Sequence, residues 1–242
     1  MSGVPEALQR VRDRLSAAAR AAGRDPEAVR LIAVSKFQPA AAIRSAYAAG
    51  QRDFGENYVQ ELQAKARELA DLAELRWHMI GHLQRNKARL VTDLASLVHT
   101  VHSVGLAQEL DKRAAGVELD VARRFNTDES RLAVLVEVNV GGEAQKSGAP
   151  PEVLPDVLRA LDQAQNLKLA GLMCVPPQTA DPRDARPFFD ELVRLRELHG
   201  GQERLPELSM GMTSDLEQAV AAGATIVRVG TAIFGERPKA GV

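Results

Sequence analysis

The chain has 242 residues, of which 45% are hydrophobic, and its 32 acidic and 31 basic residues nearly cancel. This near neutrality argues against a nucleic acid or an anionic membrane surface as the main partner. The start carries no apolar leader, no run is long enough to span a membrane, and Cys174 is the single cysteine, so we expect a soluble cytoplasmic protein without internal disulfides.

Helices and strands alternate along the predicted chain. A helix is expected over residues 5–22, because Leu8, Val11 and Leu15 fall on one face and Gly23 ends the pattern. Strand-like runs follow at regular intervals, separated by segments that mostly have helical periodicity. The eight runs end near Lys36, Gly55, Gly81, Ser103, Asn139, Cys174, Gly211 and Gly230.

Eight strands that alternate with helices predict an α/β protein, a single TIM-type (β/α)8 barrel with an extra N-terminal helix. Such a barrel uses about 250 residues, so one domain is expected to fill residues 1–242. Its active face lies at the carboxyl ends of the strands, and a phosphate site commonly follows strands 7 and 8. Residues 116–131 are polar except for Phe125, and we expect a mobile loop there before strand 5.

Lys36 closes the first strand-like run, residues 31–36 (LIAVSK). An amine reacts with a carbonyl group only when it is unprotonated, so a reactive lysine needs burial or cationic neighbours to lower its pKa from about 10.4. The mouth of a barrel offers both. The alternative is an ordinary solvated lysine at the end of a strand.

Two turns rich in glycine and hydroxyl groups follow the last two strands, at residues 211–215 (GMTSD) and 230–235 (GTAIFG). Glycine lets backbone amides approach a ligand closely, and hydroxyls donate to phosphate oxygens. The two turns together predict a phosphate site. Each of them is also compatible with a simple helix cap.

Arg228 interrupts an otherwise apolar strand, residues 226–229 (IVRV). A buried guanidinium is costly unless it is paired, so Arg228 is expected either to face a ligand or to meet an acidic side chain inside the barrel. Glu137, within residues 134–138 (VLVEV), is the candidate partner.

Six stretches carry a family resemblance, in this order: residues 34–36 (VSK), 54–61 (FGENYVQE), 77–87 (WHMIGHLQRNK), 171–173 (GLM), 208–212 (LSMGM) and 227–230 (VRVG). Over nearly the whole chain they resemble the pyridoxal phosphate homeostasis protein family, also called the YggS/PROSC family. The resemblance implies a barrel like the N-terminal domain of alanine racemase. It also implies binding of pyridoxal 5′-phosphate (PLP) as a lysine Schiff base, usually by a monomer and without established catalytic turnover.

The resemblance also implies site residues. Lys36 would form the Schiff base, Arg228 would lie near the pyridine nitrogen, and Asn57 would contact the ring region. The implied phosphate ligands are Ser209, Gly230 and Thr231. Two positions depart from the family pattern but keep the local chemistry or bulk: Thr213, where serine is usual, and Met79, where phenylalanine is common.

Three functions stay open. The favoured one is a non-catalytic PLP-binding protein that takes part in vitamin B6 homeostasis, buffering the cofactor and supplying it to PLP-dependent apo-enzymes. The second is an amino-acid racemase, but racemisation needs acid–base groups on both faces of the cofactor and Lys36 can serve only one. The two tyrosines, Tyr47 and Tyr58, lie on early segments with no evident route to the other face. The third is a cofactor-free barrel enzyme acting on a phosphorylated metabolite.

The remaining polar clusters receive plainer interpretations. His78 and His82 flank a predicted strand end, where a spacing of four does not align two metal ligands, so a metal site is not expected. His99 and His102 are expected to be one core and one rim residue. The basic patch of Arg85, Asn86, Lys87 and Arg89 is expected to be a solvated helix face, with contact to a partner enzyme or a second phosphorylated vitamer as the alternative.

Overall fold

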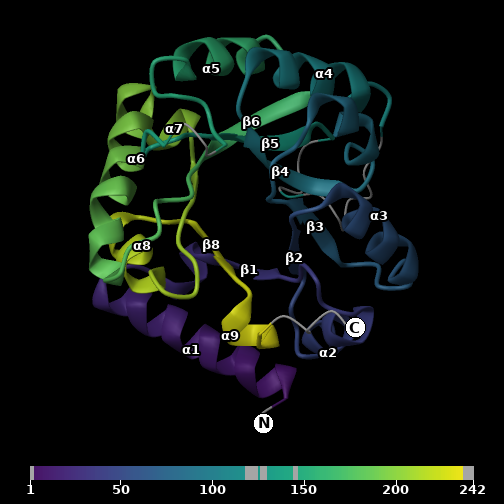
Figure 1. Cartoon of the computed structure of the whole chain (residues 1–242), viewed down its shortest axis with the longest axis vertical. Helices are drawn as coiled ribbons and strands as arrows, with labels where there is room; N and C mark the ends of the chain where they lie inside the picture. The colour runs from purple at the N-terminus through teal and green to yellow at the C-terminus, as the bar shows by residue number, and fades with distance from the viewer. Residues whose placement is uncertain (1–2, 118–124, 126–129, 144–146, 237–242) are drawn as a thin grey trace.

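A computed structural model describes residues 3–117, 125, 130–143 and 147–236. Its strands form one closed barrel in chain order, and they surround a central axis in Figure 1. Parallel pairing of β8 with β1, with Arg228 opposite Ile32, closes the ring. The strands are β1 (Arg30–Val34), β2 (Asp53–Glu56), β3 (Arg76–Met79), β4 (Ala95–Val101), β5 (Leu132–Glu137), β6 (Leu167–Met173), β7 (Glu207–Ser209) and β8 (Ile226–Val229).

Helices surround the barrel on its outer side (Figure 1). The α-helices in the described residues are α1 (Val4–Ala21), α2 (Ala40–Ala48), α3 (Val59–Glu68), α4 (Val104–Ala114), α5 (Leu154–Asp162), α6 (Arg186–Leu198), α7 (Gly201–Arg204), α8 (Leu216–Ala222) and α9 (Thr231–Phe234). Short 3-10 helices are η1 (Pro26–Ala28), η2 (Arg85–Leu90) and η4 (Pro182–Ala185). Within these described segments, no helix is both long enough and apolar enough to cross a membrane.

The predicted barrel and its extra N-terminal helix are confirmed. Helix α1 begins at Val4 and ends at Ala21, close to the predicted bounds, and each strand ends within a few residues of its predicted position. The loop predicted over residues 116–131 falls largely on residues 118–124 and 126–129, which lie outside the described residues. Phe125 is described and buried, as the anchor of that stretch was expected to be.

Helix α1 lies across the place where the barrel closes. Its apolar face, which includes Leu8, Val11 and Leu15, is buried, and the helix packs against α8, α9 and α2. In Figure 1 the first helix therefore runs beside the last elements of the chain. Arg24, in the turn after α1, donates to the Val220 carbonyl of α8 at 2.9 Å.

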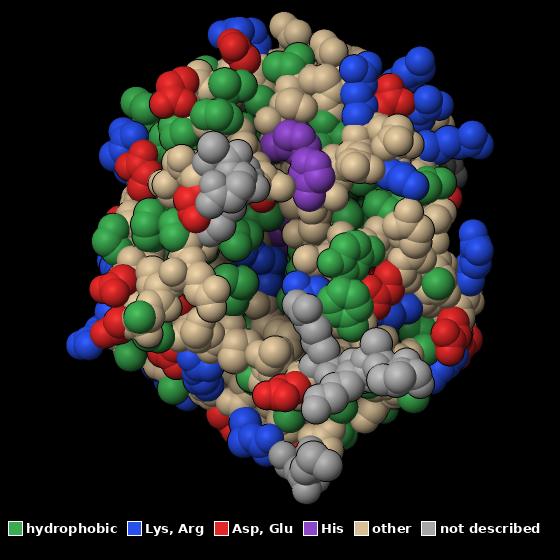
Figure 2. Space-filling model, in the orientation of Figure 1, with side chains coloured by type: hydrophobic (Ala, Val, Ile, Leu, Met, Phe, Trp, Pro, Cys, Tyr) green, Lys and Arg blue, Asp and Glu red, His purple; other side chains and the backbone are tan. Residues whose placement is uncertain are grey.

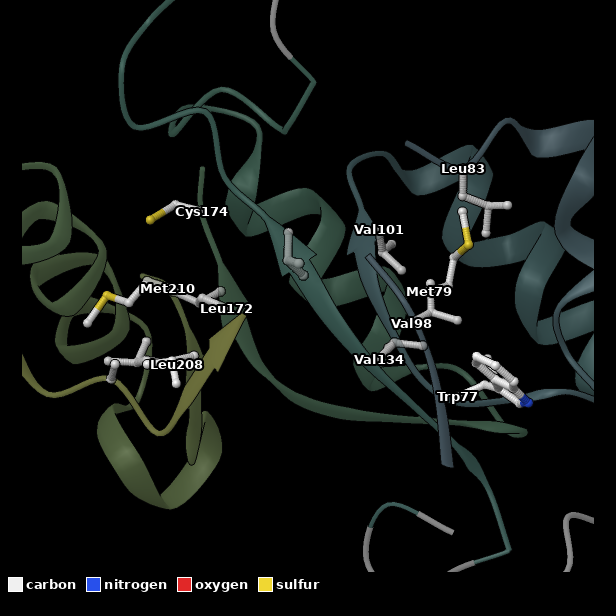
Figure 3. Close-up of a cluster of buried hydrophobic side chains, with 14 of the residues drawn as sticks. Trp77, Met79, Leu83, Val98, Val101, Val134, Leu172, Cys174, Leu208 and Met210 are labelled. Atoms are coloured by element: carbon white, nitrogen blue, oxygen red, sulfur yellow. The ribbon is translucent and has the colours of Figure 1, made fainter. Parts of the chain in front are cut away.

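The larger apolar core fills the layer between strands and helices. Figure 3 shows part of it, with Met79, Leu83 and Val98 close together and Cys174 apart from them, on the side of Leu172 and Met210. Cys174 is fully buried, as expected for a small apolar residue. A smaller cluster lines the inside of the barrel, including Ile32, Leu135 and Ile226. The rest of this interior is polar, and it leads to the candidate site.

Candidate functional site

The turn that carries Lys36 is fixed from one side by a buried lysine of α3. Lys65 Nζ donates to the Ser35 carbonyl at 2.6 Å, to Glu56 at 2.8 Å and to Glu61 at 2.7 Å. These three contacts satisfy all the donors of an ammonium group. The Ser35 hydroxyl also donates to Glu56, at 2.6 Å. The residue directly before Lys36 therefore has little freedom.

The residue directly after Lys36 is fixed as well. Phe37 has a φ of 63°, in the left-handed region that a bulky residue rarely adopts. Its amide donates to Glu61 at 2.5 Å, and its ring packs 5.4 Å from the ring of Tyr58. A strained conformation of this kind persists only where the surroundings enforce it. Half-buried Lys36 is thus held at a defined place on the rim.

The two predicted phosphate turns meet on the same rim. The hydroxyls of Thr231 and Thr213 lie 3.2 Å apart, although β7 and β8 deliver them from different turns. The Met212 amide donates to Asp215 at 2.6 Å, and Arg14 of α1 donates to the Thr213 carbonyl at 2.7 Å. Both bonds fix the path of the first turn.

Gly230 brings this pair of turns against the end of β1. A methyl group added at Gly230 would lie 3.2 Å from the Val34 carbonyl oxygen, so the backbones there are in close contact. Val34 precedes Lys36 by two residues. The rim therefore places Lys36, Gly230 and Thr231 around one opening, and Figure 2 shows the molecule hollowed there, with Lys or Arg side chains deep in the hollow.

Asn57 follows β2 on the same rim and is half-buried. Its backbone is in contact with Gly81 after β3, where an added Cβ would meet the Asn57 carbonyl oxygen at 2.1 Å. Glycine at position 81 is thus required for the ends of β2 and β3 to approach, and this approach fixes the place of Asn57.

Arg228 and Ser209 lie deeper, inside the barrel, and both are buried. Arg228 donates to the Ser209 hydroxyl oxygen at 2.6 Å and to the Cys174 carbonyl at 2.9 Å. The ion pair with Glu137, one of the two expectations for Arg228, is not formed: no carboxylate among the described residues lies within ion-pair distance of this guanidinium. Burial lowers the pKa of Arg228. A buried cation whose hydrogen bonds go only to neutral acceptors favours an electron-rich ligand.

Glu137 itself ends β5 and is buried. Its Oε2 atom has no hydrogen-bond partner, and burial raises the pKa of this carboxyl to about 7, against the opposing effect of Arg228. A buried polar atom without a partner is uncommon in native structures and marks a place where a ligand can supply the missing bond.

Two buried histidines, His99 and His78, lie deeper in the polar interior of the barrel than Ser209 and Arg228. His99 Nδ1 lies 2.9 Å from the Ser209 hydroxyl, and His99 Nε2 lies 3.1 Å from His78 Nδ1. His78 Nε2 in turn lies 3.0 Å from Asp53 Oδ1. The expectation that one of His99 and His102 is a core residue and the other a rim residue is confirmed, since His99 is fully buried and His102 only half-buried.

Sequence reasoning missed the residues that support the site. Lys65 and Glu61 are four apart on α3, a spacing that indicates a helical ion pair but not that the pair reaches Ser35 and Phe37. Asp53 stands at the start of β2, directly before Phe54 and Gly55, which was a signal for a buried carboxylate. The predicted binding roles of Lys36, Asn57, Ser209, Arg228, Gly230 and Thr231 stay predictions.

The basic patch of Arg85, Asn86, Lys87 and Arg89 lies on η2 rather than on an α-helix, and three of its four residues are exposed. On the neighbouring rim, the rings of His82 and His102 lie 4.8 Å apart. Across the part of the chain that the structure describes, no group of three or more His, Cys, Asp or Glu side chains could hold a metal ion.

Comparison with known proteins gives consistent matches over almost the whole chain. Residues 7–238 match the sequence model of the alanine racemase N-terminal domain. A pyridoxal phosphate homeostasis protein of Pseudomonas aeruginosa is 48% identical over 239 residues, which cover 98% of this chain and 97% of that protein. The protein of the same name from Escherichia coli is 40% identical over 241 residues, 98% of both chains. The solved structure of PipY from Synechococcus elongatus PCC7942 with PLP bound has a TM-score of 0.78 and 39% identity, and covers 96% of this chain and 100% of PipY.

Proposed function

The chain belongs to the family of pyridoxal phosphate homeostasis proteins, and on this premise we propose that it binds PLP in the mouth of the barrel and takes part in intracellular vitamin B6 homeostasis. The observation that carries the proposal is the rim itself. Lys36 is fixed beside two adjoining hydroxyl turns, and a buried guanidinium without a carboxylate partner lies below it.

The residues present fit this cofactor. The Thr231 and Thr213 hydroxyls and the backbone at Gly230 suit a phosphate, and Arg228 suits a pyridine nitrogen with a free lone pair. The unpartnered carboxyl of Glu137 leaves a hydrogen bond for a polar ligand group. When bound, PLP supplies an aldehyde that condenses reversibly with an amine. Lys36 is the amine we assign to that role, and Asn57 lines the ring region.

Arg228 sets the character of the site. A guanidinium is always protonated, so it donates a hydrogen bond to the ring nitrogen and discourages a proton there. A pyridine ring without that proton withdraws electrons weakly. The site is thereby suited to holding the cofactor and unsuited to stabilising negative charge on an amino acid.

We further propose that the protein has no catalytic turnover of its own, acts as a monomer within the cytoplasm and passes PLP to apo-enzymes, with residues 1–242 forming one domain. Racemisation needs a second acid–base group opposite Lys36. Tyr47 packs under Arg52 at 4.1 Å, and Tyr58 packs on Phe37, on the Lys36 side of the mouth. The positions of both tyrosines support a binding protein over a racemase.

The first test is labelling of Lys36. Wild type, Lys36→Ala and Lys112→Ala, a control on the exposed face of α4, would be incubated with PLP, gel-filtered, reduced with borohydride and mapped by mass spectrometry. We expect visible absorbance in wild type and control, a pyridoxyl group on Lys36, and loss of both in Lys36→Ala. Wild type that retains no PLP overturns the proposal. Exchange of the α-hydrogen of added amino acids would instead support the racemase.

Delivery is tested separately, by mixing loaded protein with an apo-enzyme that needs PLP. If the apo-enzyme is activated faster than free PLP is released to a scavenger, the result supports direct transfer. If it is activated only at the rate of release to the scavenger, the function is limited to buffering. The basic patch provides the variant for this assay, since Lys87→Ala is expected to slow transfer only if η2 contacts the recipient.

A further inference from the structure

A continuous column of hydrogen-bonded side chains runs through the inside of the barrel. It connects Asp53, His78, His99, Ser209 and Arg228, with successive distances of 3.0, 3.1, 2.9 and 2.6 Å. All five residues are buried. They come from strands β2, β3, β4, β7 and β8, so the column connects the amino-terminal end of the barrel, at Asp53, with the candidate site at Arg228.

The two ends of the column fix its polarity. Arg228 is a donor only, and it donates to the Ser209 oxygen. At the other end, Arg76 makes a two-pronged contact with Asp53 at 2.9 and 2.8 Å, and Arg30 lies 3.4 Å from it. Burial alone would raise the pKa of Asp53, but hydrogen bonds from His78 and Arg76 and the charge of Arg30 hold it well below its usual range. Asp53 is therefore a carboxylate, which only accepts.

Each histidine then has one possible tautomer. Burial lowers the pKa of both imidazoles, so each is neutral and carries one proton. His78 must donate from Nε2 to Asp53, which leaves its Nδ1 as an acceptor for the Nε2 proton of His99. His99 Nδ1 then accepts the hydroxyl proton of Ser209. The opposite order would point the Nε2 lone pair of His78 at the Asp53 carboxylate.

We propose that His99 is a positioning residue that, by accepting the Ser209 proton, turns the Ser209 oxygen toward Arg228 and fixes the guanidinium for the ligand in the barrel mouth. The guanidinium of Arg228 is then held by two acceptors, which are Ser209 Oγ and the Cys174 carbonyl. Both acceptors are neutral, so neither competes with the ligand for the guanidinium as a carboxylate would. The charged end at Asp53 sets the direction of the whole column. The part of this proposal that concerns cofactor binding rests on the proposed function.

The same assignment bears on the predicted phosphate role of Ser209. Its proton is directed to His99 and one lone pair to Arg228, so Ser209 has no hydrogen left to donate to a phosphate. We infer that Ser209 serves the pyridine side of the site through Arg228, whereas Thr213 and Thr231 remain available to the phosphate.

The column is tested first without cofactor. Long-range ¹⁵N–¹H NMR of the histidine rings in the cofactor-free protein distinguishes the tautomers and the imidazolium form. We expect two neutral, Nε2-protonated rings, assigned with His78→Gln and His99→Asn variants, with no change of charge between about pH 7.5 and 9. A ring at position 99 that is protonated on Nδ1, or charged in this range, overturns the proposal. Asp53→Asn, which offers a donor to His78 Nε2, should reverse both tautomers.

The second arm measures PLP binding. His99→Leu, which has no acceptor, should weaken PLP binding about tenfold or more and alter the absorbance of the bound cofactor, because the Ser209 hydroxyl is then no longer held with its oxygen toward Arg228. His99→Asn places an amide oxygen near the former Nδ1 and should restore most of the affinity. Equal binding by wild type and His99→Leu overturns the positioning role. Borohydride labelling of Lys36 in wild type shows separately whether PLP binds at all, so the two proposals fail independently.

Discussion

Lys65 is the residue whose loss should most affect the Lys36 turn. It is buried, and its ammonium group holds the Ser35 carbonyl and two carboxylates. Burial raises the pKa of Glu56, and the charge of Lys65 opposes that rise. Removal of the cation would leave both Glu56 and Glu61 without their cationic partner, and breaking a buried ion pair from one side typically costs about 3–5 kcal/mol.

We expect Lys65→Met to lower the free energy of unfolding by about 3 kcal/mol or more, measured by urea denaturation. It should also weaken PLP retention, because Ser35 and Phe37 on either side of Lys36 lose their support. Lys112→Met, on an exposed position of α4, is the matched control and should change neither quantity. A Lys65→Met protein as stable as the control would contradict the role given to the cluster.

At the scale of the element, the turn between β7 and α8 depends on a glycine in the left-handed region. Gly211 has a φ of 93°, and an added Cβ would lie 2.4 Å from the Ala219 side chain. Gly223, at the other end of α8, has a φ of 111° but no atom within 4 Å of such a Cβ. A side chain at Gly223 would thus meet backbone strain alone, whereas a side chain at Gly211 would meet both backbone strain and a steric clash with Ala219.

Gly223→Ala should cost only the strain, about 1 kcal/mol of unfolding free energy. Gly211→Ala should cost several times as much and should weaken PLP binding, because α8 must move and the turn carrying Thr213 moves with it. Thermal and urea unfolding of the pair provide the comparison. Equal losses in the two variants would show that the close packing at Ala219 is easily relieved.

The elements themselves could be predicted from the sequence, because an alternation of apolar strands with amphipathic helices has few topological solutions. Helix α1 and the ends of β1, β7 and β8 were found in this way, and so was the rim that holds Lys36 and Thr231. The segment after β3 is less regular than expected, a 3-10 helix from Arg85 to Leu90.

The contacts inside the barrel could not be predicted, because they depend on the register of strands far apart in the sequence. A register shift between Trp77 and His78, where β3 pairs with β4, sets the level at which His78 and His99 meet. No local pattern encodes such a shift. The sequence pattern alone made Glu137 a reasonable ion-pair partner for Arg228. In the folded chain Arg228 instead donates to the Ser209 hydroxyl and the Cys174 carbonyl.

At the scale of the whole molecule, Glu137 should make stability depend on pH. The pKa of its carboxyl rises to about 7 in the folded protein, against about 4.3 in an unfolded chain. The folded state therefore binds the proton more tightly. This contribution is fully present below about pH 4 and is lost as the pH rises to about 7.

Compared with Glu137→Gln, cofactor-free wild type should lose up to about 3 kcal/mol of unfolding free energy between pH 5 and pH 8.5. The glutamine keeps the shape of the protonated acid but cannot ionise. Urea denaturation across this range measures the difference, with the exposed position Glu152→Gln as the control. Parallel curves for wild type and Glu137→Gln would mean that this carboxyl is better solvated than its burial indicates.

The position of α1 also has a consequence for how a ribosome delivers this protein. Helix α1 leaves the ribosome well before α8 and α9, on which it mainly packs, and β1 likewise precedes its partner β8. The apolar face of α1, with Leu8, Val11 and Leu15, therefore lacks much of its cover until α8 and α9 have been synthesised. During that interval the nascent chain presents to chaperones and proteases the same surface that later fastens the barrel.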